Sequence, residues 1–371
     1  MKTNQELYNE RLDRIKTAVA LGKPDRVPVL PVGSAFCAQY KGVKLSEFAM
    51  NPRMCNKTML EAYTSLGEID GVQQQVFYPF VLCPQWFSNI ELPGRELGEN
   101  KLWQMAEAEL MTVEDYDVII EKGYNAFLKE FQANKLDHAL DKVIENLAPF
   151  TAESIQNFAD AGLPVLAPFV YTTPYEYFCG GRSMVRFMKD LYKIPDKVQE
   201  AMDAAMVDYM ENMRKEIRTF KPLGAWVGGW RSASSFLAPK FWKRFVWPYF
   251  KQLVNLAIEE GIIPILHLDS NWERDLEFFK ELPKGKCIIT PDGSTDIYKI
   301  KEVLGDHMCI MGDVTSAMFS VATPDEVYNY SKKLINDLGP SGFILASGCD
   351  IPYNAKPENV KAMIAAATGD K

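Results

Sequence analysis

One histidine, one aspartate and one cysteine are spaced in the sequence as a metal site would need them. An apolar run ends in His267-Leu268-Asp269, and a later run leads to Cys349. Residues two apart on a strand point to the same side, so the side chains of His267 and Asp269 should lie together. An imidazole, a carboxylate and a thiolate can hold zinc and leave a fourth position open, as catalytic zinc sites do. We therefore predict a three-ligand zinc site; the alternative is a hydrogen-bonded structural histidine at a strand end.

Short apolar runs separated by helical stretches must position these side chains. The runs are Val27–Val32, Gly71–Phe77, Pro164–Val170, Gly224–Gly229, Ile262–Leu268, Cys287–Thr290, Met308–Met311 and Gly342–Ala346. Most are bounded by proline or glycine, which is typical of buried parallel strands. Eight strands alternating with helices favour an α/β fold of the (β/α)8 TIM-barrel type over an open sheet, and no G-x-G-x-x-G motif follows the first run. Active sites of such barrels lie at the carboxyl ends of the strands, where the three candidate ligands are expected.

One stretch interrupts this alternation. Residues of about 80–150 separate the second and third predicted strands and are too many for one crossover; they include Trp86, Trp103 and a charged helical segment near Glu109–Lys135. We expect a helical insertion that covers the barrel mouth; the alternative is a peripheral helical pair without functional consequence. With this insertion, residues 1–371 are predicted to form a single barrel domain.

Aromatic residues are expected around the same rim. Trp230 and Arg231 follow the fourth run, Tyr171 follows the third, and Phe77 ends the second. A mouth lined in this way would suit a flat apolar substrate or the face of a corrin ring. Ordinary core packing is the competing explanation for these side chains.

Further acidic and sulfur-bearing residues are weaker candidates. Asp292 and Asp313 are expected in rim loops, where they could contact a substrate or simply form turns, as Asp-Gly sequences do. Asp70 precedes the second run and could equally cap a helix or brace a turn. Cys309 is a reserve metal ligand, but its place within a strand favours packing as a small hydrophobic residue.

Composition narrows the class of protein. The chain has 371 residues, of which 47% are hydrophobic and 24% charged, as in a globular enzyme with a large core. A net charge of −8 argues against nucleic acid or an anionic membrane as the main partner. No run approaches the roughly 18 apolar residues that span a bilayer, and the N-terminus lacks the apolar region of a secretory signal. Seven scattered cysteines without a C-x-x-C pair indicate a reducing, cytoplasmic location, whereas monomer and homodimer both stay open.

Several motifs resemble the uroporphyrinogen decarboxylase superfamily over nearly the whole chain outside residues 80–150. They are Lys23-Pro24-Asp25-Arg26-Val27-Pro28, Leu66-Gly67-Glu68-Ile69-Asp70-Gly71, Gly180-Gly181, Ala238-Pro239-Lys240-Phe241, Trp247-Pro248-Tyr249 and Met311-Gly312-Asp313-Val314. True decarboxylases grip the porphyrinogen carboxylates with an arginine-rich N-terminal motif. The matching stretch here, residues 29–37, contains no arginine. An acidic, arginine-poor mouth disfavours a substrate with many carboxylates.

The cobamide-dependent methyltransferase branch is a closer resemblance. Its members that methylate coenzyme M hold zinc with a His-x-Cys pair and a later cysteine, where this chain has His267, Asp269 and Cys349. Aspartate in place of the middle cysteine gives a harder ligand set and a better Lewis acid toward oxygen. The chain thus resembles the methyltransferase I component of anaerobic aryl-ether O-demethylases.

That resemblance implies a function and its partners. The expected reaction moves a methyl group from an aryl methyl ether, of the guaiacol, vanillate or veratrol type, to cob(I)amide. The corrinoid must come from a separate corrinoid protein, since the chain has no Asp-x-His-x-x-Gly motif. Zinc on His267, Asp269 and Cys349 would be the catalytic centre, and Trp230, Arg231, Tyr171, Phe77, Asp292 and Asp313 would contact the substrate. Three alternatives stay open: a methylcobamide:thiol methyltransferase, a uroporphyrinogen-decarboxylase-like lyase and a non-catalytic corrinoid- or ligand-binding barrel.

Overall fold

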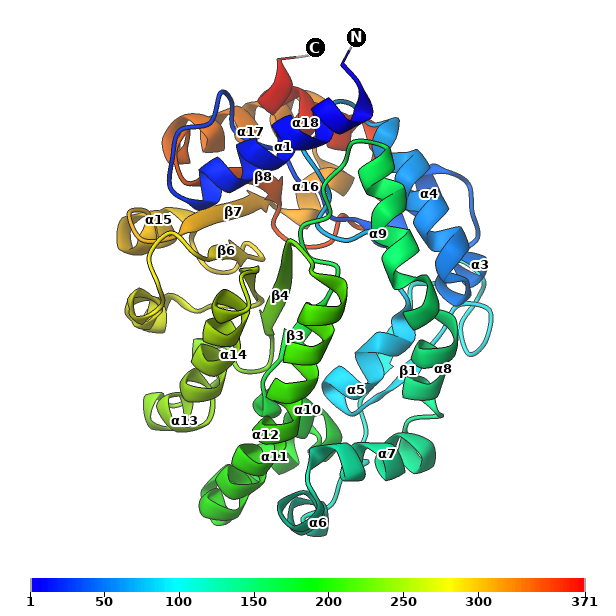
Figure 1. The fold of residues 1–371 in the computed structure, drawn as a ribbon, viewed down its shortest axis with the longest axis vertical. Coiled ribbons are helices and arrows are strands. Elements are labelled where there is room, and N and C mark those ends of the chain that lie inside the picture. Colours follow the sequence, from blue (N-terminus) through cyan, green and yellow to red (C-terminus); the bar gives the residue numbers. More distant parts are fainter. Residues whose placement is uncertain (1, 370–371) are drawn as a thin grey trace.

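A parallel sheet of six strands forms the centre of the computed structural model, which describes residues 2–369. The strands follow one another in chain order across the sheet (Figure 1). They are β3 (Val170–Thr172), β4 (Gly224–Gly229), β5 (Ile263–Leu268), β6 (Ile288–Pro291), β7 (Cys309–Val314) and β8 (Phe343–Ser347). Parallel strands in sequential order with helices between them are the arrangement of a (β/α)8 barrel. The predicted fold class is confirmed.

The first two predicted strands are wrong as regular strands. Val27–Val32 and Gly71–Phe77 form only isolated bridges, Val29 with Leu345 and Val72 with Val165. Backbone hydrogen bonds still join these two segments to their neighbours in the barrel. The amide of Leu30 donates to the carbonyl of Leu345, and that of Val72 donates to the carbonyl of Pro164, each at 3.0 Å. Prolines at positions 28, 31, 164 and 168 lack the amide hydrogen that a regular ladder requires. They also explain why the third strand begins at Val170 rather than at Pro164.

A buried carboxylate fastens these irregular segments to each other. Asp70 accepts a hydrogen bond from the backbone of Val29 at 2.8 Å. It also pairs with Arg14 and Arg26, each at 2.5 Å. Asp70 therefore braces the first two segments of the barrel. Of the two structural roles considered for this residue, bracing fits these contacts and helix capping does not.

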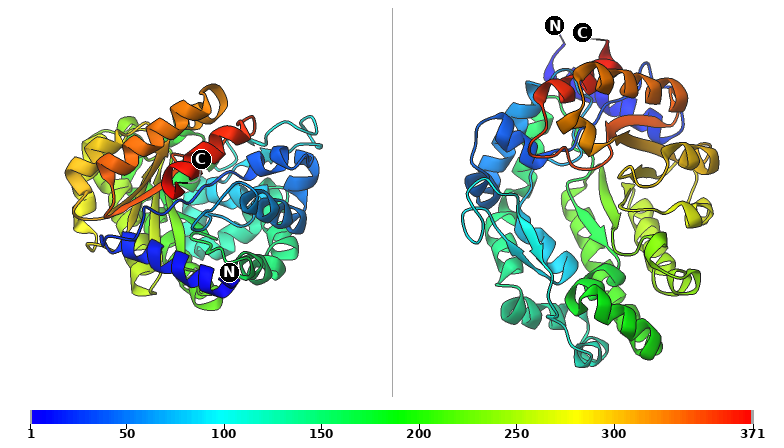
Figure 2. Two further views of the ribbon diagram at one scale, coloured as in Figure 1. Left: turned by 90° about the horizontal axis from the view of Figure 1, so that it is seen from above. Right: turned by 180° about the vertical axis from the view of Figure 1, so that it is seen from behind.

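Helices cover the outside of the sheet, and the first and last helices of the chain lie at the same end of the molecule (Figure 2). The helices outside the insertion are α1 (Asn4–Val19), α2 (Ser34–Tyr40), α3 (Leu45–Met50), α4 (Pro52–Thr64), α9 (Thr151–Asp160), α10 (Pro174–Arg182), α11 (Met184–Lys193), α12 (Pro195–Phe220), α13 (Pro239–Phe245), α14 (Trp247–Glu259), α15 (Ile297–Leu304), α16 (Ser316–Val321), α17 (Pro324–Leu338) and α18 (Pro357–Thr368). Proline in the first turn starts several of them, because its fixed φ suits that position and its missing amide is not needed there.

The expected insertion is largely helical. It contains α5 (Leu82–Trp86), α6 (Glu114–Lys122), α7 (Tyr124–Lys135) and α8 (Ala139–Asn146), together with an antiparallel pair, β1 (Asn89–Glu91) and β2 (Gln104–Ala106). Its Phe87 ring lies 4.9 Å from the ring of Tyr177 on α10. The insertion thus shares the hydrophobic core of the barrel.

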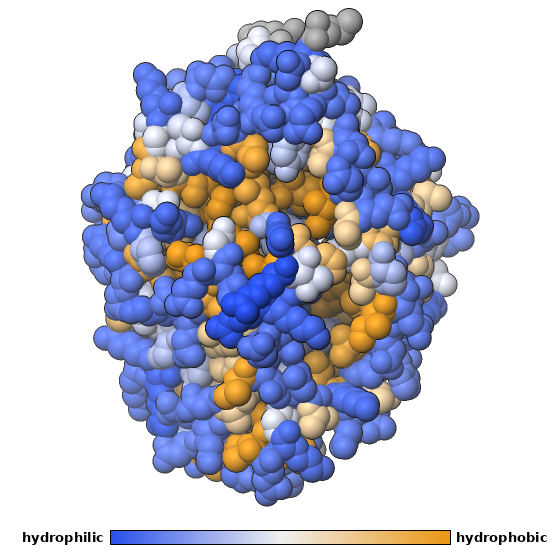
Figure 3. All heavy atoms as spheres, in the orientation of Figure 1, coloured by the Kyte–Doolittle hydropathy of each residue, from blue (hydrophilic) through white to orange (hydrophobic). Residues whose placement is uncertain are grey.

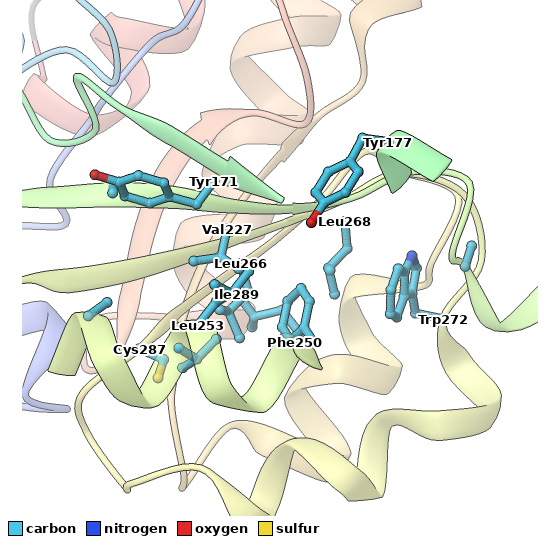
Figure 4. Close-up of a cluster of buried hydrophobic side chains, with 14 of the residues drawn as sticks. Tyr171, Tyr177, Val227, Phe250, Leu253, Leu266, Leu268, Trp272, Cys287 and Ile289 are labelled. Atoms are coloured by element: carbon cyan, nitrogen blue, oxygen red, sulfur yellow. The ribbon is translucent and has the colours of Figure 1, made fainter. Parts of the chain in front are cut away.

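Each strand divides its side chains between the inside and the outside of the barrel. Outward-facing Val227, Leu266 and Ile289 pack against α14 (Figure 4). Inward-facing Ile265 packs with Cys309, which confirms that Cys309 fills the barrel as a small hydrophobic residue. Each such buried side chain stabilises the fold by roughly 1.5–3 kcal/mol. Across residues 2–369, no helix is both long and apolar enough to cross a membrane.

Candidate metal centre

His267, Asp269 and Cys349 converge as predicted. One ligand atom from each lies within 4.8 Å of the others. Nε2 of His267 is 3.3 Å from Oδ1 of Asp269 and 3.7 Å from Sγ of Cys349. His267 is in β5, Asp269 directly follows it, and Cys349 lies two residues beyond β8. Strand alternation and the carboxyl-end position of both segments bring the three side chains to one rim.

These separations suit a tetrahedral zinc ion. Zinc bonds of about 2.0 Å to nitrogen and oxygen and 2.3 Å to sulfur place tetrahedral ligand atoms roughly 3.3–3.6 Å apart. Oδ1 of Asp269 is buried and, apart from its 3.3 Å contact with Nε2 of His267, has no hydrogen-bond partner among residues 2–369. Buried oxygens almost always have a partner, so a cation would satisfy this one. The residues present therefore fit zinc.

The electrostatics around the imidazole favour positive charge. Burial alone would lower the pKa of His267, but the Asp269 carboxylate and the Cys349 thiol beside Nε2 raise it to about 10. The Trp226 ring stacks on the imidazole at 4.2 Å with an angle of 13° between the planes. Nδ1 is buried, and no described residue accepts its hydrogen. Packing against Trp226, rather than a hydrogen bond at Nδ1, sets the orientation of the ring.

A cavity of about 490 Å³ opens beside the three residues, which all line it. Its walls are mainly apolar and rich in aromatic side chains: Phe77, Tyr78, Trp86, Trp103, Tyr124, Phe169, Tyr209, Phe220, Trp226 and Trp230 line it. In Figure 3, apolar side chains gather in the hollowed middle of the face shown. The size and lining suit a small aromatic molecule. The insertion contributes to the walls through residues of α5 and α8.

Two of the predicted substrate contacts lie in this cavity, and two others point elsewhere. Trp230 packs edge-on against Trp86 at 4.9 Å, and Phe77 stacks on Trp103 at 4.5 Å. Neither Tyr171 nor Arg231 is among the lining residues. The Tyr171 side chain lies on the outer face of β3 with Val227 and Leu266 (Figure 4). The guanidinium of Arg231 lies 4.0 Å from the carboxylate of Glu107.

The two rim aspartates have local partners. Asp292 accepts hydrogen bonds from the backbone of Ser270 at 2.9 Å and of Ser294 at 2.7 Å. Asp313 lies inside β7 and accepts from the Tyr330 hydroxyl at 3.1 Å. Burial raises the pKa of Asp313 to about 6. Neither carboxylate lines the cavity, and Asp292 acts as a turn former.

Glu176 on α10 is a buried residue that the sequence patterns do not reveal. Its carboxylate accepts hydrogen bonds from the backbone of Trp230 at 2.8 Å, of Arg231 at 2.9 Å and of Ser232 at 3.0 Å. The Ser232 hydroxyl donates to it at 2.5 Å. Burial raises the pKa of Glu176, and these four donors oppose that shift. Glu176 therefore fixes the loop after β4 and positions Trp230 in the cavity wall.

The fold is shared with a solved structure. A methyltransferase from Methanosarcina mazei superposes with a TM-score of 0.73 at 18% identity, covering 96% of this chain and 97% of that one. The similarity shows a shared fold. A structure entitled the IOLI protein with a binding zinc atom covers 68% of this chain and 90% of that one at 10% identity, but its TM-score of 0.35 carries no argument. None of the curated proteins compared with the sequence matches it.

A family model also matches the sequence. The model of uroporphyrinogen decarboxylase (URO-D) matches residues 165–369. That region is more than half of the chain and contains β3 to β8, His267, Asp269 and Cys349. The chain belongs to the uroporphyrinogen decarboxylase family.

Proposed function

We propose that this chain is a zinc-dependent methyltransferase. It would move a methyl group from an aryl methyl ether to the cob(I)amide of a separate corrinoid protein. The observation that carries the proposal is the convergence of His267, Asp269 and Cys349 at the edge of an aromatic cavity. Membership of the uroporphyrinogen decarboxylase family and a full-length structural neighbour named as a methyltransferase support it.

The three ligand side chains define what chemistry the site can do. Zinc bound there would supply Lewis acidity toward the ether oxygen, on which negative charge develops as the methyl group leaves. Asp269 in place of a thiolate keeps the ligand set hard and suits an oxygen leaving group. Trp226 holds the His267 ring in place, and the aromatic walls orient the substrate ring and exclude water.

The corrinoid partner needs access to the candidate metal site. We propose that the corrinoid protein docks over the carboxyl ends of the strands, where the methyl group becomes accessible. The full chain would act as a single domain in the cytoplasm, in keeping with its seven free cysteines. Monomeric and homodimeric forms are both compatible with this arrangement.

The test is an assay with the zinc-loaded protein, a reduced corrinoid protein and a methoxyarene such as guaiacol. We expect release of the phenol in equal amount to the methylated corrinoid, followed by the change in the corrinoid absorption spectrum. A free hydroxyl beside the methoxy group should help, because it offers a second oxygen ligand to zinc. Absence of phenol from a panel of methoxyarenes would contradict the proposal.

Trp230 should contribute to binding of the aromatic substrate. Replacing Trp230 with alanine removes a large wall of the cavity and should weaken binding by roughly 1–3 kcal/mol. Trp230→Phe keeps a ring at this position and should lose much less. Isothermal titration calorimetry with several aryl ethers measures both variants. Unchanged affinity in Trp230→Ala would show that the ring only packs against Trp86.

A further inference from the structure

The cavity passes through the barrel wall beside β3. Residues 72–73 are joined to residues 164–167 by backbone hydrogen bonds, the last running from Ala167 to Gln73 at 2.8 Å. Beyond this point no backbone hydrogen bond in the described chain joins residues 74–78 to residues 168–172, and both segments line the cavity. The Gln85 side chain alone donates to the Val170 carbonyl across the opening, at 3.2 Å. The cavity therefore extends from the inside of the barrel to the outer side of β3.

Glu216 on α12 lies at this outer end. It lines the cavity together with Phe220 of the same helix. Its Oε2 accepts a hydrogen bond from the Tyr171 hydroxyl at 2.7 Å. Within residues 2–369, no other side chain donates to this carboxylate and no lysine or arginine pairs with it. Burial raises the pKa of Glu216, while the hydrogen bond from Tyr171 opposes the shift.

Away from the candidate metal centre, the cavity has no cationic side chain to bind an anion. No lysine or arginine is among its lining residues, whereas Glu216, Asp269 and Asp350 all line it. A ligand carboxylate or sulfonate placed here would lose its water without gaining a cation, which is unfavourable. A hydroxyl or ammonium group would instead find in Glu216 an acceptor with an open oxygen.

We infer that Glu216 is a specificity-determining residue that accepts a hydrogen bond from the distal end of an aromatic ligand and excludes ligands bearing a carboxylate there. The favoured class is a methoxyphenol with a hydroxymethyl or aminomethyl group, and the disfavoured class is a methoxybenzoate. That these ligands are methyl donors rests on the proposed function; the binding preference does not.

Vanillyl alcohol and vanillate form a matched pair for the test, because they differ mainly in a neutral donor against a carboxylate. Isothermal titration calorimetry on the full-length, zinc-loaded protein should give at least about tenfold tighter binding of vanillyl alcohol, since like charges brought together in an apolar site repel strongly. Glu216→Gln keeps the shape but removes the charge, and should reduce this ratio about tenfold. Glu200→Gln removes an exposed carboxylate from the same helix and should leave the ratio unchanged.

Three outcomes would overturn the inference: a wild-type preference for vanillate, no binding of either ligand, or the same preference in Glu216→Gln as in the wild type. Thermal unfolding of each variant shows that it is folded. A protein that binds with the expected preference but releases no phenol in the corrinoid assay would contradict the proposed function alone. One that demethylates both ligands equally well and binds them equally would contradict only the role of Glu216.

Discussion

Replacing His267 with alanine should remove zinc and methyl transfer together. The change takes away the only nitrogen ligand and leaves Asp269 and Cys349, too few to hold zinc firmly. Because loss of groups that merely orient a ligand already costs about 10–100-fold in metal affinity, loss of the ligand itself should cost more. We expect zinc content after dialysis to fall from one per chain to a small fraction, and methyl transfer to fall below detection.

Metal analysis and the corrinoid assay on the same preparation check this result. His138→Ala is the matched control. The His138 side chain is 60% exposed and pairs with Asp141, and both residues are far in sequence from the three candidate ligands. It should keep full zinc and full activity. Full zinc occupancy in His267→Ala would refute the assignment of the site.

Replacing Asp70 with alanine should instead destabilise the fold without touching the site. The carboxylate is fully buried against Arg14, whose side chain is 4% exposed, and also holds Arg26 and the backbone of Val29. Removing one partner of a buried ion pair leaves an uncompensated charge and costs about 3–5 kcal/mol. We expect that loss in the free energy of unfolding measured by denaturant titration, with zinc affinity of the folded protein unchanged.

Asp25 provides the control for this prediction. It pairs with the same Arg14 at 2.6 Å, but its side chain is 65% exposed. Arg14 lowers the pKa of Asp25 to about 2, yet solvent screens so exposed a pair. Asp25→Ala should therefore lose no more than about 1 kcal/mol. Equal losses in both variants would show that burial at Asp70 is not the cause.

The convergence of the three candidate ligands could be predicted from sequence because it depends on local rules. His267 and Asp269 are two apart at the end of a strand, and Cys349 follows the strand that ends at the same rim, so alternation and barrel topology bring them together. The fold class could also be predicted from a local pattern, because short apolar runs alternate with helical stretches along the chain. The prolines in the first and third runs explain why the first two runs form no regular strands and why β3 begins late.

The remainder of the cavity depends on packing between distant segments. β3 begins six residues later than expected, so Tyr171 falls within the strand, where alternation turns its side chain to the outer face. Glu216 is one of several acids on a long surface helix, and only the opening beside β3 exposes it to the cavity. Glu176 resembles an ordinary acid in the first turn of a helix, and its four donors come from a loop more than 50 residues later.

The most direct measurement follows the methyl group itself. The zinc-loaded protein is given a methoxyarene with a deuterated methyl group, a reduced corrinoid protein and a thiol, and the label is traced by mass spectrometry. An oxygen-directed zinc site with Asp269 among its ligands predicts that the label reaches the corrinoid at the rate of phenol release and that the protein alone forms no thioether. The contrary result is an intact methoxyarene together with rapid transfer of a methyl group from methylcobalamin to the thiol. That result would contradict the proposed transfer from an aryl ether to the corrinoid.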